Sequence, residues 1–292
     1  MAKKKKEKNE EETKKHSPLY KGILSIIRMF NRIVIFIIEI PYFLYKGIVR
    51  VTRYAKKKNE QVIIKKEREK MMPTYEPLLL IESYKGKLDE FEKEFFKNES
   101  TIGIIIGSRG SGKSALGMKL SENMYARKKR RVYAMGFEEK TLPSWINNTI
   151  DTSEIKNDSL ILIDEGGILF SSRKSMSQAN KLLSELMLIA RHKGLSIIFI
   201  SQNSSNLDVN ILRQADYLML RHPSLLQLEF ERDTVKKLYE EYKGGFEKRK
   251  DDKGLTLVYS GQFIGFASNS LPSFWTKKMS TSFRKNNNDQ SK

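Results

Sequence analysis

Cysteine is absent from the 292-residue sequence, and histidine occurs only three times. The chain therefore cannot form disulfides, a thiolate zinc site or a thiol nucleophile, and three scattered histidines do not favour an imidazole metal cage. The lack of cysteine is typical of an intracellular chain. Acidic residues are also scarce, because 35 Asp and Glu oppose 54 Lys and Arg, which gives a formal net charge of +19. Polyanions, either nucleic acid or an anionic membrane surface, are therefore the expected partners, ahead of small acidic substrates.

The basic excess is concentrated at the front of the chain. Residues 1–70 hold 20 basic and 8 acidic residues, a net charge of +12, which leaves +7 for the rest of the chain. Residues 1–19 are rich in Lys and Glu with almost nothing apolar to bury, so we expect a disordered basic tail, and residues 282–292 are expected to be disordered as well. Met72-Pro73 and Pro77 predict a domain boundary after a charged linker at residues 55–74.

Residues 20–54 are dominated by large apolar side chains, yet they contain seven charged residues. At about 100° per residue these seven project into an arc of about 60°, which predicts one long amphipathic helix, bent at Pro41. No uncharged stretch is longer than residues 33–38, too short for a conventional membrane span. A helix lying in the plane of an anionic membrane surface fits this pattern; packing on the protein's own domain or on sister subunits is the alternative. The seven charged residues are Lys21, Arg28, Arg32, Glu39, Lys46, Arg50 and Arg53.

Residues 75–281 alternate between apolar strands and amphipathic helices, which is typical of an α/β domain with a mostly parallel sheet. A buried strand is expected at residues 101–106, followed by a loop with the pattern G-x-x-x-x-G-K-S and a helix from Ala115. In that context the loop predicts a phosphate site, where Lys113 reaches the β and γ oxygens and Ser114 offers a hydroxyl to Mg²⁺. A glycine-rich turn without a ligand is the alternative. The loop consists of Gly107, Ser108, Arg109, Gly110, Ser111, Gly112, Lys113 and Ser114.

A second apolar strand begins at Ser159 and ends in two adjacent carboxylates, Asp164 and Glu165. Asp164 is expected to hold Mg²⁺ through its water shell, and Glu165 to orient or deprotonate the attacking water, so the pair predicts hydrolysis. A surface turn after a core strand is the alternative. Asp164 and the next three residues also fit the D-x-x-G of GTPases, but no Asn-Lys-x-Asp base reader follows, since Asn180-Lys181 continues into an apolar helix. We therefore expect ATP.

A third strand, residues 195–201, ends at Gln202. The P-loop, the Asp-Glu pair and the segment from Leu188 to Gln202 together resemble the FtsK/HerA superfamily of ring-forming DNA translocases. That superfamily includes viral genome-packaging ATPases, and its close relatives include conjugation coupling proteins and Zot-like assembly ATPases. The resemblance spans about residues 100–222. It implies a RecA-like P-loop NTPase fold, a homo-oligomeric ring, and Gln202 as the γ-phosphate sensor. It also implies Arg191 or Arg213 as an arginine finger acting on a neighbour's nucleotide, although a surface salt bridge explains either arginine equally well.

The remaining part of the domain is expected to contain one charged helix at residues 225–250 and two short strands at residues 255–259 and 262–267. Residues 271–275 form an aromatic anchor ending in Trp275, for which packing in the core or a lid is favoured over stacking on a base.

The sequence as a whole leads to the hypothesis of a membrane-tethered ATPase that oligomerises and couples ATP hydrolysis to the translocation of DNA, which it binds without sequence preference. It is expected on the cytoplasmic face of a host membrane or a virion's internal membrane. Viral genome packaging is the favoured role. A Zot-like or coupling-protein role in extrusion is the first alternative, and a membrane scaffold that uses ATP only as a switch is the second.

Overall fold

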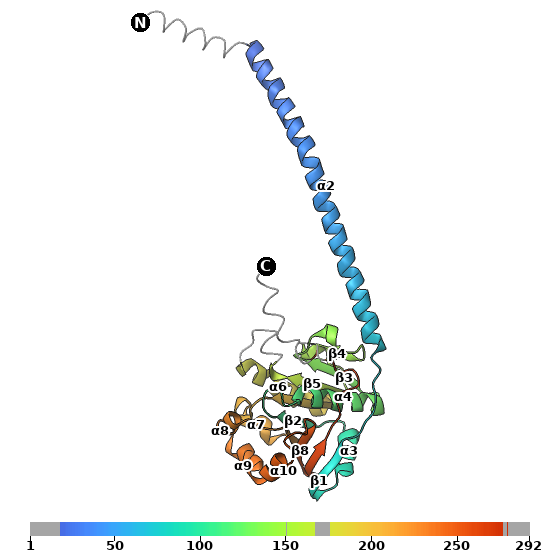
Figure 1. Cartoon of the computed structure of the whole chain (residues 1–292), viewed down its shortest axis with the longest axis vertical. Coiled ribbons are helices and arrows are strands. Elements are labelled where there is room, and N and C mark those ends of the chain that lie inside the picture. The colour runs from blue at the N-terminus through green and yellow to red at the C-terminus, as the bar shows by residue number, and fades with distance from the viewer. Residues whose placement is uncertain (1–17, 150, 167–175, 277–278, 280–292) are drawn as a thin grey trace, which may run out of the picture. The chain divides into compact units, whose positions relative to one another are not determined.

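The structure, a computed structural model, describes residues 18–149, 151–166, 176–276 and 279 (Figure 1). The chain divides into two compact units, Met1–Ile63 and Ile64–Lys292, which are described separately below. The two predicted tails lie outside the described residues, except that Pro18 and Leu19 begin the first helix.

The described part of the first unit, from Pro18, lies in the amphipathic helix that the sequence predicts. This helix, α2 (Pro18–Lys70), contains Pro41 without an interruption and continues beyond residue 54 into the segment expected to be a linker. The continuation has a local cause, because residues 55–70 are mostly Lys, Glu, Gln and Arg, which favour helices, and no glycine or proline occurs there. Large apolar side chains such as Phe30 and Phe36, each 65% exposed, lie open along the helix. None of the described helices has the length and apolarity needed to cross a membrane.

The second unit is built on one nine-stranded sheet within the described residues, in the order β1-β9-β8-β7-β2-β6-β5-β3-β4. From β7 to β4 every neighbouring pair is parallel, and β8, β9 and β1 extend the sheet with antiparallel pairs. The strands are β1 (Leu79–Gly86), β2 (Ile102–Ile106), β3 (Arg131–Met135), β4 (Ile146–Asn148), β5 (Ser159–Asp164), β6 (Leu195–Ser201), β7 (Tyr217–Leu220), β8 (Leu255–Ser260) and β9 (Phe263–Ser268).

Helices cover both faces of this sheet, and a hydrophobic cluster lies on each side. One cluster is formed with α3 (Leu88–Lys97) and α4 (Lys113–Lys128), and the other with α6 (Met176–Lys193) and the shorter helices α7 (Val209–Arg213), α9 (Asp233–Glu241) and α10 (Lys243–Lys248). The central strands are buried on both faces and are therefore mostly apolar, as in Ile104–Ile106. The three-layer arrangement with a parallel centre confirms the predicted α/β P-loop NTPase fold.

The single helix expected at residues 225–250 is wrong, because three helices occupy this stretch. They are α8 (Leu225–Glu229), α9 and α10. Between α8 and α9 the buried Glu231 accepts a hydrogen bond from the Ser204 backbone N–H at 2.7 Å, and Arg232 donates from Nε to the Ser204 carbonyl at 2.9 Å. The chain leaves the helical path there, because both side chains bind the loop that follows β6.

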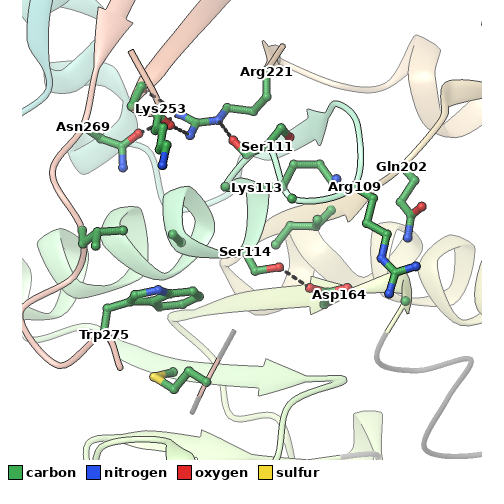
Figure 2. Close-up of a pocket in the computed structure, with 18 of the residues that line it drawn as sticks. Arg109, Ser111, Lys113, Ser114, Asp164, Gln202, Arg221, Lys253, Asn269 and Trp275 are labelled. Carbon is green, nitrogen blue, oxygen red and sulfur yellow. Dashed lines mark hydrogen bonds between the residues drawn. The ribbon is translucent and has the colours of Figure 1, made fainter. Parts of the chain in front are cut away.

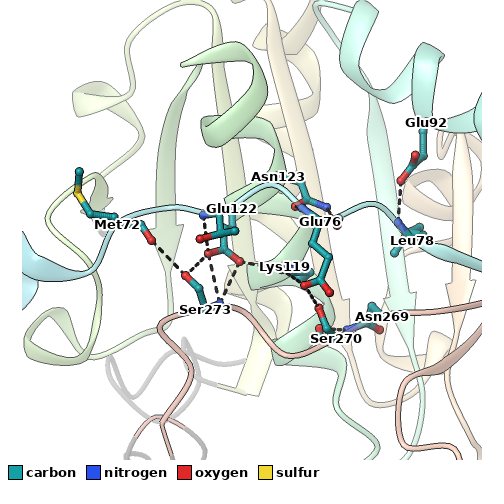
Figure 3. Close-up of polar contacts among 11 residues, drawn as sticks. Met72, Glu76, Leu78, Glu92, Lys119, Glu122, Asn123, Asn269, Ser270 and Ser273 are labelled. Carbon is teal, nitrogen blue, oxygen red and sulfur yellow. Dashed lines mark hydrogen bonds and ion pairs between the residues drawn. The ribbon is translucent and has the colours of Figure 1, made fainter.

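Three of the buried polar residues in the middle of helix α4, Lys119, Glu122 and Asn123, have partners on two segments distant in sequence (Figure 3). Glu122 accepts hydrogen bonds from the backbone N–H of Thr74 at 3.1 Å and of Ser273 at 3.1 Å, and lies 3.2 Å from the Lys119 ammonium. Asn123 accepts from the Glu76 N–H at 3.0 Å. The helix that follows the P-loop therefore binds residues 74–76 and Ser273.

Candidate nucleotide site

The predicted phosphate loop connects the carboxyl end of β2 to the first residue of α4, as a P-loop requires. Two of its glycines adopt positive φ angles, +82° at Gly110 and +87° at Gly112. A Cβ atom at Gly112 would also lie 2.4 Å from Nη2 of Arg221. Only glycine fits this position without strain, and the loop can therefore turn its backbone toward a phosphate.

The loop borders a pocket of about 920 Å³ in the described structure (Figure 2). Figure 2 shows Arg109, Asp164 and Gln202 on one side of the P-loop, and Lys253, Asn269 and Trp275 on the other. The residues that line the pocket are Arg109–Ala115, Phe137, Thr141, Asp164, Gly166, Ile200, Ser201, Gln202, Arg221, Asp251–Gly254, Asn269, Leu271, Trp275 and Met279.

Lys113 places a buried ammonium group at the P-loop. Its side chain is 8% exposed, and Nζ donates hydrogen bonds to the carbonyls of Gly107 at 2.7 Å and Ser108 at 2.8 Å. Burial lowers the pKa of Lys113 to about 8, while the negative charge of Asp164 acts in the opposite direction. Because water solvates this ammonium poorly, the negative charge of phosphate oxygens would stabilise it strongly.

Ser114 and Asp164 meet at the edge of the pocket, as the sequence predicts for a magnesium site. The Ser114 hydroxyl donates to Oδ2 of Asp164 at 2.7 Å (Figure 2). No group of three or more His, Asp or Glu that could hold a metal occurs among the described residues. One hydroxyl and one carboxylate, completed by phosphate oxygens and water, fit Mg²⁺, which binds proteins through few side chains. Ser114 and Asp164 are therefore the residues that would hold it.

Glu165 lies behind the pocket and does not line it. Its side chain is 3% exposed, and the Ser201 hydroxyl donates to Oε2 at 2.5 Å. Burial raises the pKa of Glu165, and the hydrogen bond from Ser201 lowers it. The carboxylate must therefore leave Ser201 to reach a water molecule at a γ-phosphate.

The residues that the resemblance implies for the γ-phosphate lie in two places. Gln202 is exposed at the end of β6 and lines the pocket on the same side as Arg109 and Asp164 (Figure 2). Arg191 is in the last turn of α6 and Arg213 ends α7, so both precede strands and lie toward the opposite edge of the sheet. Both arginines are exposed and neither lines the pocket of its own chain.

Sequence reasoning missed Arg221. Its side chain is 2% exposed, and its Nε donates to the Ser111 carbonyl of the P-loop at 2.7 Å. Its Nη1 donates to the Gly254 carbonyl at 2.7 Å and to Oδ1 of Asn269 at 3.1 Å. Burial lowers its pKa to about 10. The available signal was its position directly after the apolar strand β7, where polar residues of a parallel sheet gather near the site.

Comparison with known proteins locates the sequence similarity in the centre of this domain. Residues 117–225 match the family model of zonular occludens toxin (Zot), which covers fewer than half of the residues and begins just after the P-loop. The matched segment includes Asp164, Glu165 and Gln202. No curated protein matches the chain.

Several solved structures are similar to part of the chain. The DNA-packaging ATPase B204 from Sulfolobus turreted icosahedral virus is 16% identical, with a TM-score of 0.42, over 59% of this chain and 98% of that chain. The genome packaging NTPase B204 from Sulfolobus turreted icosahedral virus 2, in complex with AMPPCP, is 16% identical, with a TM-score of 0.42, over 60% of this chain and 100% of that chain. The KaiC-like protein PH0186 from Pyrococcus horikoshii OT3 is 13% identical, with a TM-score of 0.34, over 50% of this chain and 82% of that chain.

Proposed function

We propose that this chain is a membrane-associated P-loop ATPase that couples ATP hydrolysis to the movement of DNA, with viral genome packaging as its role. The observation that carries the ATPase proposal is the site itself. A P-loop lysine, the hydrogen-bonded pair Ser114 and Asp164, and Gln202 all border one pocket, with Glu165 directly behind Asp164. This arrangement supplies the groups that phosphoryl transfer to water needs.

In this proposal each residue has a separate task. The backbone of the P-loop and the Lys113 ammonium bind the phosphates, and Ser114 with Asp164 would hold Mg²⁺, which supplies charge neutralisation at the β and γ oxygens. Gln202 orients the γ-phosphate or the attacking water from the end of β6. Glu165, once released from Ser201, accepts a proton from that water.

Replacing Glu165 with glutamine tests the hydrolytic assignment. We expect the Glu165→Gln protein to bind ATP with the affinity of the wild type and to release phosphate at least about 100 times more slowly, because general-base catalysis contributes about 10²–10⁴-fold. Equilibrium dialysis with ATP and a phosphate-release assay measure the two quantities. Glu185→Gln, at an exposed position on α6, is the matched control. Wild-type turnover in the Glu165→Gln protein would remove Glu165 from the mechanism.

The membrane proposal rests on α2. The seven charged residues between positions 20 and 54 project into a narrow arc of this helix, and its apolar side chains, including Ile33, Phe36 and Ile37, are exposed by 46%, 65% and 59%. An in-plane helix buries that apolar face in the lipid while its basic residues contact anionic headgroups. Such a helix would place the ATPase unit at the cytoplasmic face of a host membrane or a virion's internal membrane.

Vesicle binding tests this proposal. The full chain should float with vesicles that contain anionic lipid and should bind less at high salt, because each basic residue near the surface contributes about 1 kcal/mol. The triple substitution Ile33→Ser, Phe36→Ser and Ile37→Ser should weaken binding even at low salt, because apolar burial is insensitive to salt. A chain lacking residues 1–63, which keeps the contact of Arg68 with Glu139, should bind ATP but not vesicles. Failure of the full chain to float at any salt would leave subunit packing as the role of α2.

The DNA and ring proposals rest on charge and on the resemblance to ring-forming translocases. A chain with a net charge of +19 and no groove-reading motif is suited to bind the phosphate backbone of DNA of any sequence. The resemblance supports a homo-oligomeric ring, in which Arg191 or Arg213 acts on the nucleotide of a neighbouring subunit. The match of residues 117–225 to the Zot family favours a second candidate, a Zot-like motor that assembles or extrudes a virus through a membrane. A capsid-protein gene beside the gene for this chain would favour packaging.

A further inference from the structure

The side of the pocket opposite Asp164 has no role in phosphate chemistry. A P-loop holds the γ-phosphate near its magnesium ligands, here Ser114 and Asp164, with Gln202 beside them. The nucleoside of a bound triphosphate must therefore leave the loop toward the other side. In Figure 2 that side presents Asn269 and Trp275.

Beside Lys253, this side presents the amide of Asn269 and the indole of Trp275 (Figure 2). The pocket as a whole is also lined by apolar side chains, among them Phe137, Leu271 and Met279. Trp275 is half-buried: it packs against the hydrophobic cluster that includes Phe274, and it also borders the pocket. Phe274 is 5% exposed and packs in the core as the sequence predicts, so the two neighbouring aromatic residues have different environments. We propose that the Trp275 indole is the surface on which the nucleobase of the bound nucleotide stacks, an inference that rests on the proposed nucleotide-binding function.

The position of Trp275 is fixed relative to the P-loop. Residues 269–275, which we call the pocket strap, are bound through Ser273 to α4, the helix that begins at Lys113 (Figure 3). Ser273 donates from its N–H to Glu122 at 3.1 Å, and its hydroxyl also donates to Glu122. The backbone N–H of Trp275 donates a hydrogen bond to the Pro272 carbonyl at 2.9 Å, which forms a turn. Because one helix carries both the phosphate loop and the strap, the stacking surface is already in place before a nucleotide binds.

Asn269 adds a polar contact at the same end. Its Oδ1 accepts from Arg221 at 3.1 Å, and its Nδ2 donates to the Ser270 carbonyl at 2.8 Å. A primary amide has two N–H donors, so a second one remains for the ribose or the base edge. Any nucleobase can stack on an indole ring. The free N–H of the Asn269 amide can donate to acceptors on either adenine or guanine. Trp275 therefore provides affinity for a nucleoside triphosphate but does not select adenine.

The test compares ATP with inorganic tripolyphosphate, which has the phosphates but no base. In the full chain, Trp275→Ala should raise the Kd for ATP at least about tenfold, because loss of base stacking on an aromatic side chain has effects of this size. The Kd for tripolyphosphate should stay unchanged, and GTP should be weakened as much as ATP. Trp275→Phe should bind ATP within a few-fold of the wild type. Trp145→Phe is the control, because Trp145 stacks on Tyr125 at 4.9 Å and lies outside the pocket lining.

Tryptophan fluorescence gives an independent readout that does not depend on the alanine variant folding. In the Trp145→Phe protein Trp275 is the sole tryptophan, and saturating ATP should change its emission whereas tripolyphosphate should not. An unchanged Kd for ATP in Trp275→Ala, equal weakening of ATP and tripolyphosphate, or unchanged emission on saturation with ATP would each overturn the stacking role. If the wild type binds ATP and tripolyphosphate equally tightly, only the stacking role falls. If the wild type binds neither, the proposed nucleotide site falls with it.

Discussion

Lys113→Ala should raise the Kd for ATP at least about 100-fold, the largest effect on binding that we expect from a single substitution. Hydrogen bonds to charged groups contribute about 1.5–3 kcal/mol each. The Lys113 ammonium has one N–H left beside its bonds to the Gly107 and Ser108 carbonyls, and exchanging one of those carbonyls for a phosphate oxygen would give it two such bonds. The buried position of Lys113, whose pKa is lowered to about 8 by burial, increases the effect because water competes poorly for this charge. Equilibrium dialysis with ATP and with tripolyphosphate measures it, and both ligands should be weakened alike.

Lys181→Ala is the matched control for this substitution, because the Lys181 side chain is 78% exposed on α6 and its Nζ lies 4.0 Å from Glu185. It should leave the Kd for ATP unchanged. The melting temperature of the Lys113→Ala protein should not fall, because the substitution removes a desolvated charge whose partners are backbone carbonyls. ATP affinity within a few-fold of the wild type would contradict the assignment of this loop as the phosphate site.

Glu122→Ala should cause the largest loss of stability. Its carboxylate is fully buried on α4 and accepts hydrogen bonds from the N–H groups of Thr74 and Ser273, and it lies 3.2 Å from the ammonium of Lys119. Removing one partner of a buried ion pair costs about 3–5 kcal/mol. Lys119 keeps its contact with Glu76 at 3.0 Å, but the N–H groups of Thr74 and Ser273 lose their acceptor. At about 2–4 °C per kcal/mol for a unit of this size, the melting temperature should fall by about 6–20 °C.

Thermal unfolding followed by circular dichroism measures this change. Glu185→Ala removes a carboxylate of the same length from an exposed pair, and should change the free energy of unfolding by no more than about 0.5 kcal/mol. Glu122→Gln keeps the shape and one acceptor, and should be intermediate. A fall of less than about 2 °C for Glu122→Ala would show that the contacts in Figure 3 do not hold the pocket strap and residues 74–76 to α4.

The sequence was most informative where a pattern is local. The strand before Gly107, the loop through Ser114 and the carboxylates after β5 were each predicted within a residue or two, because glycine spacing and apolar runs specify them directly. The structure adds the hydrogen bond between Ser114 and Asp164, which joins residues fifty positions apart. Parallel order in the sheet brings these two together, and that order is a property of the whole domain.

Contacts between segments that are distant in the sequence could not be predicted from local sequence patterns. Nothing near Arg221 in the sequence shows that its guanidinium binds the carbonyls of Ser111 and Gly254. The break before α9 has a similar cause, because Glu231 leaves the helical path to bind Ser204. Trp275 illustrates the same limit: its neighbour Phe274 packs in the core, and only the fold turns Trp275 toward the pocket.

The most direct test of the proposed function is the rate of phosphate release by the full chain with and without double-stranded DNA. We expect DNA to stimulate turnover, and Glu165→Gln to abolish turnover both with and without DNA. The stimulation should fall steeply as the salt concentration rises, because DNA binding by phosphate neutralisation releases counterions. Turnover that is the same with and without DNA at low salt would contradict a DNA motor and favour the nucleotide-switched membrane scaffold.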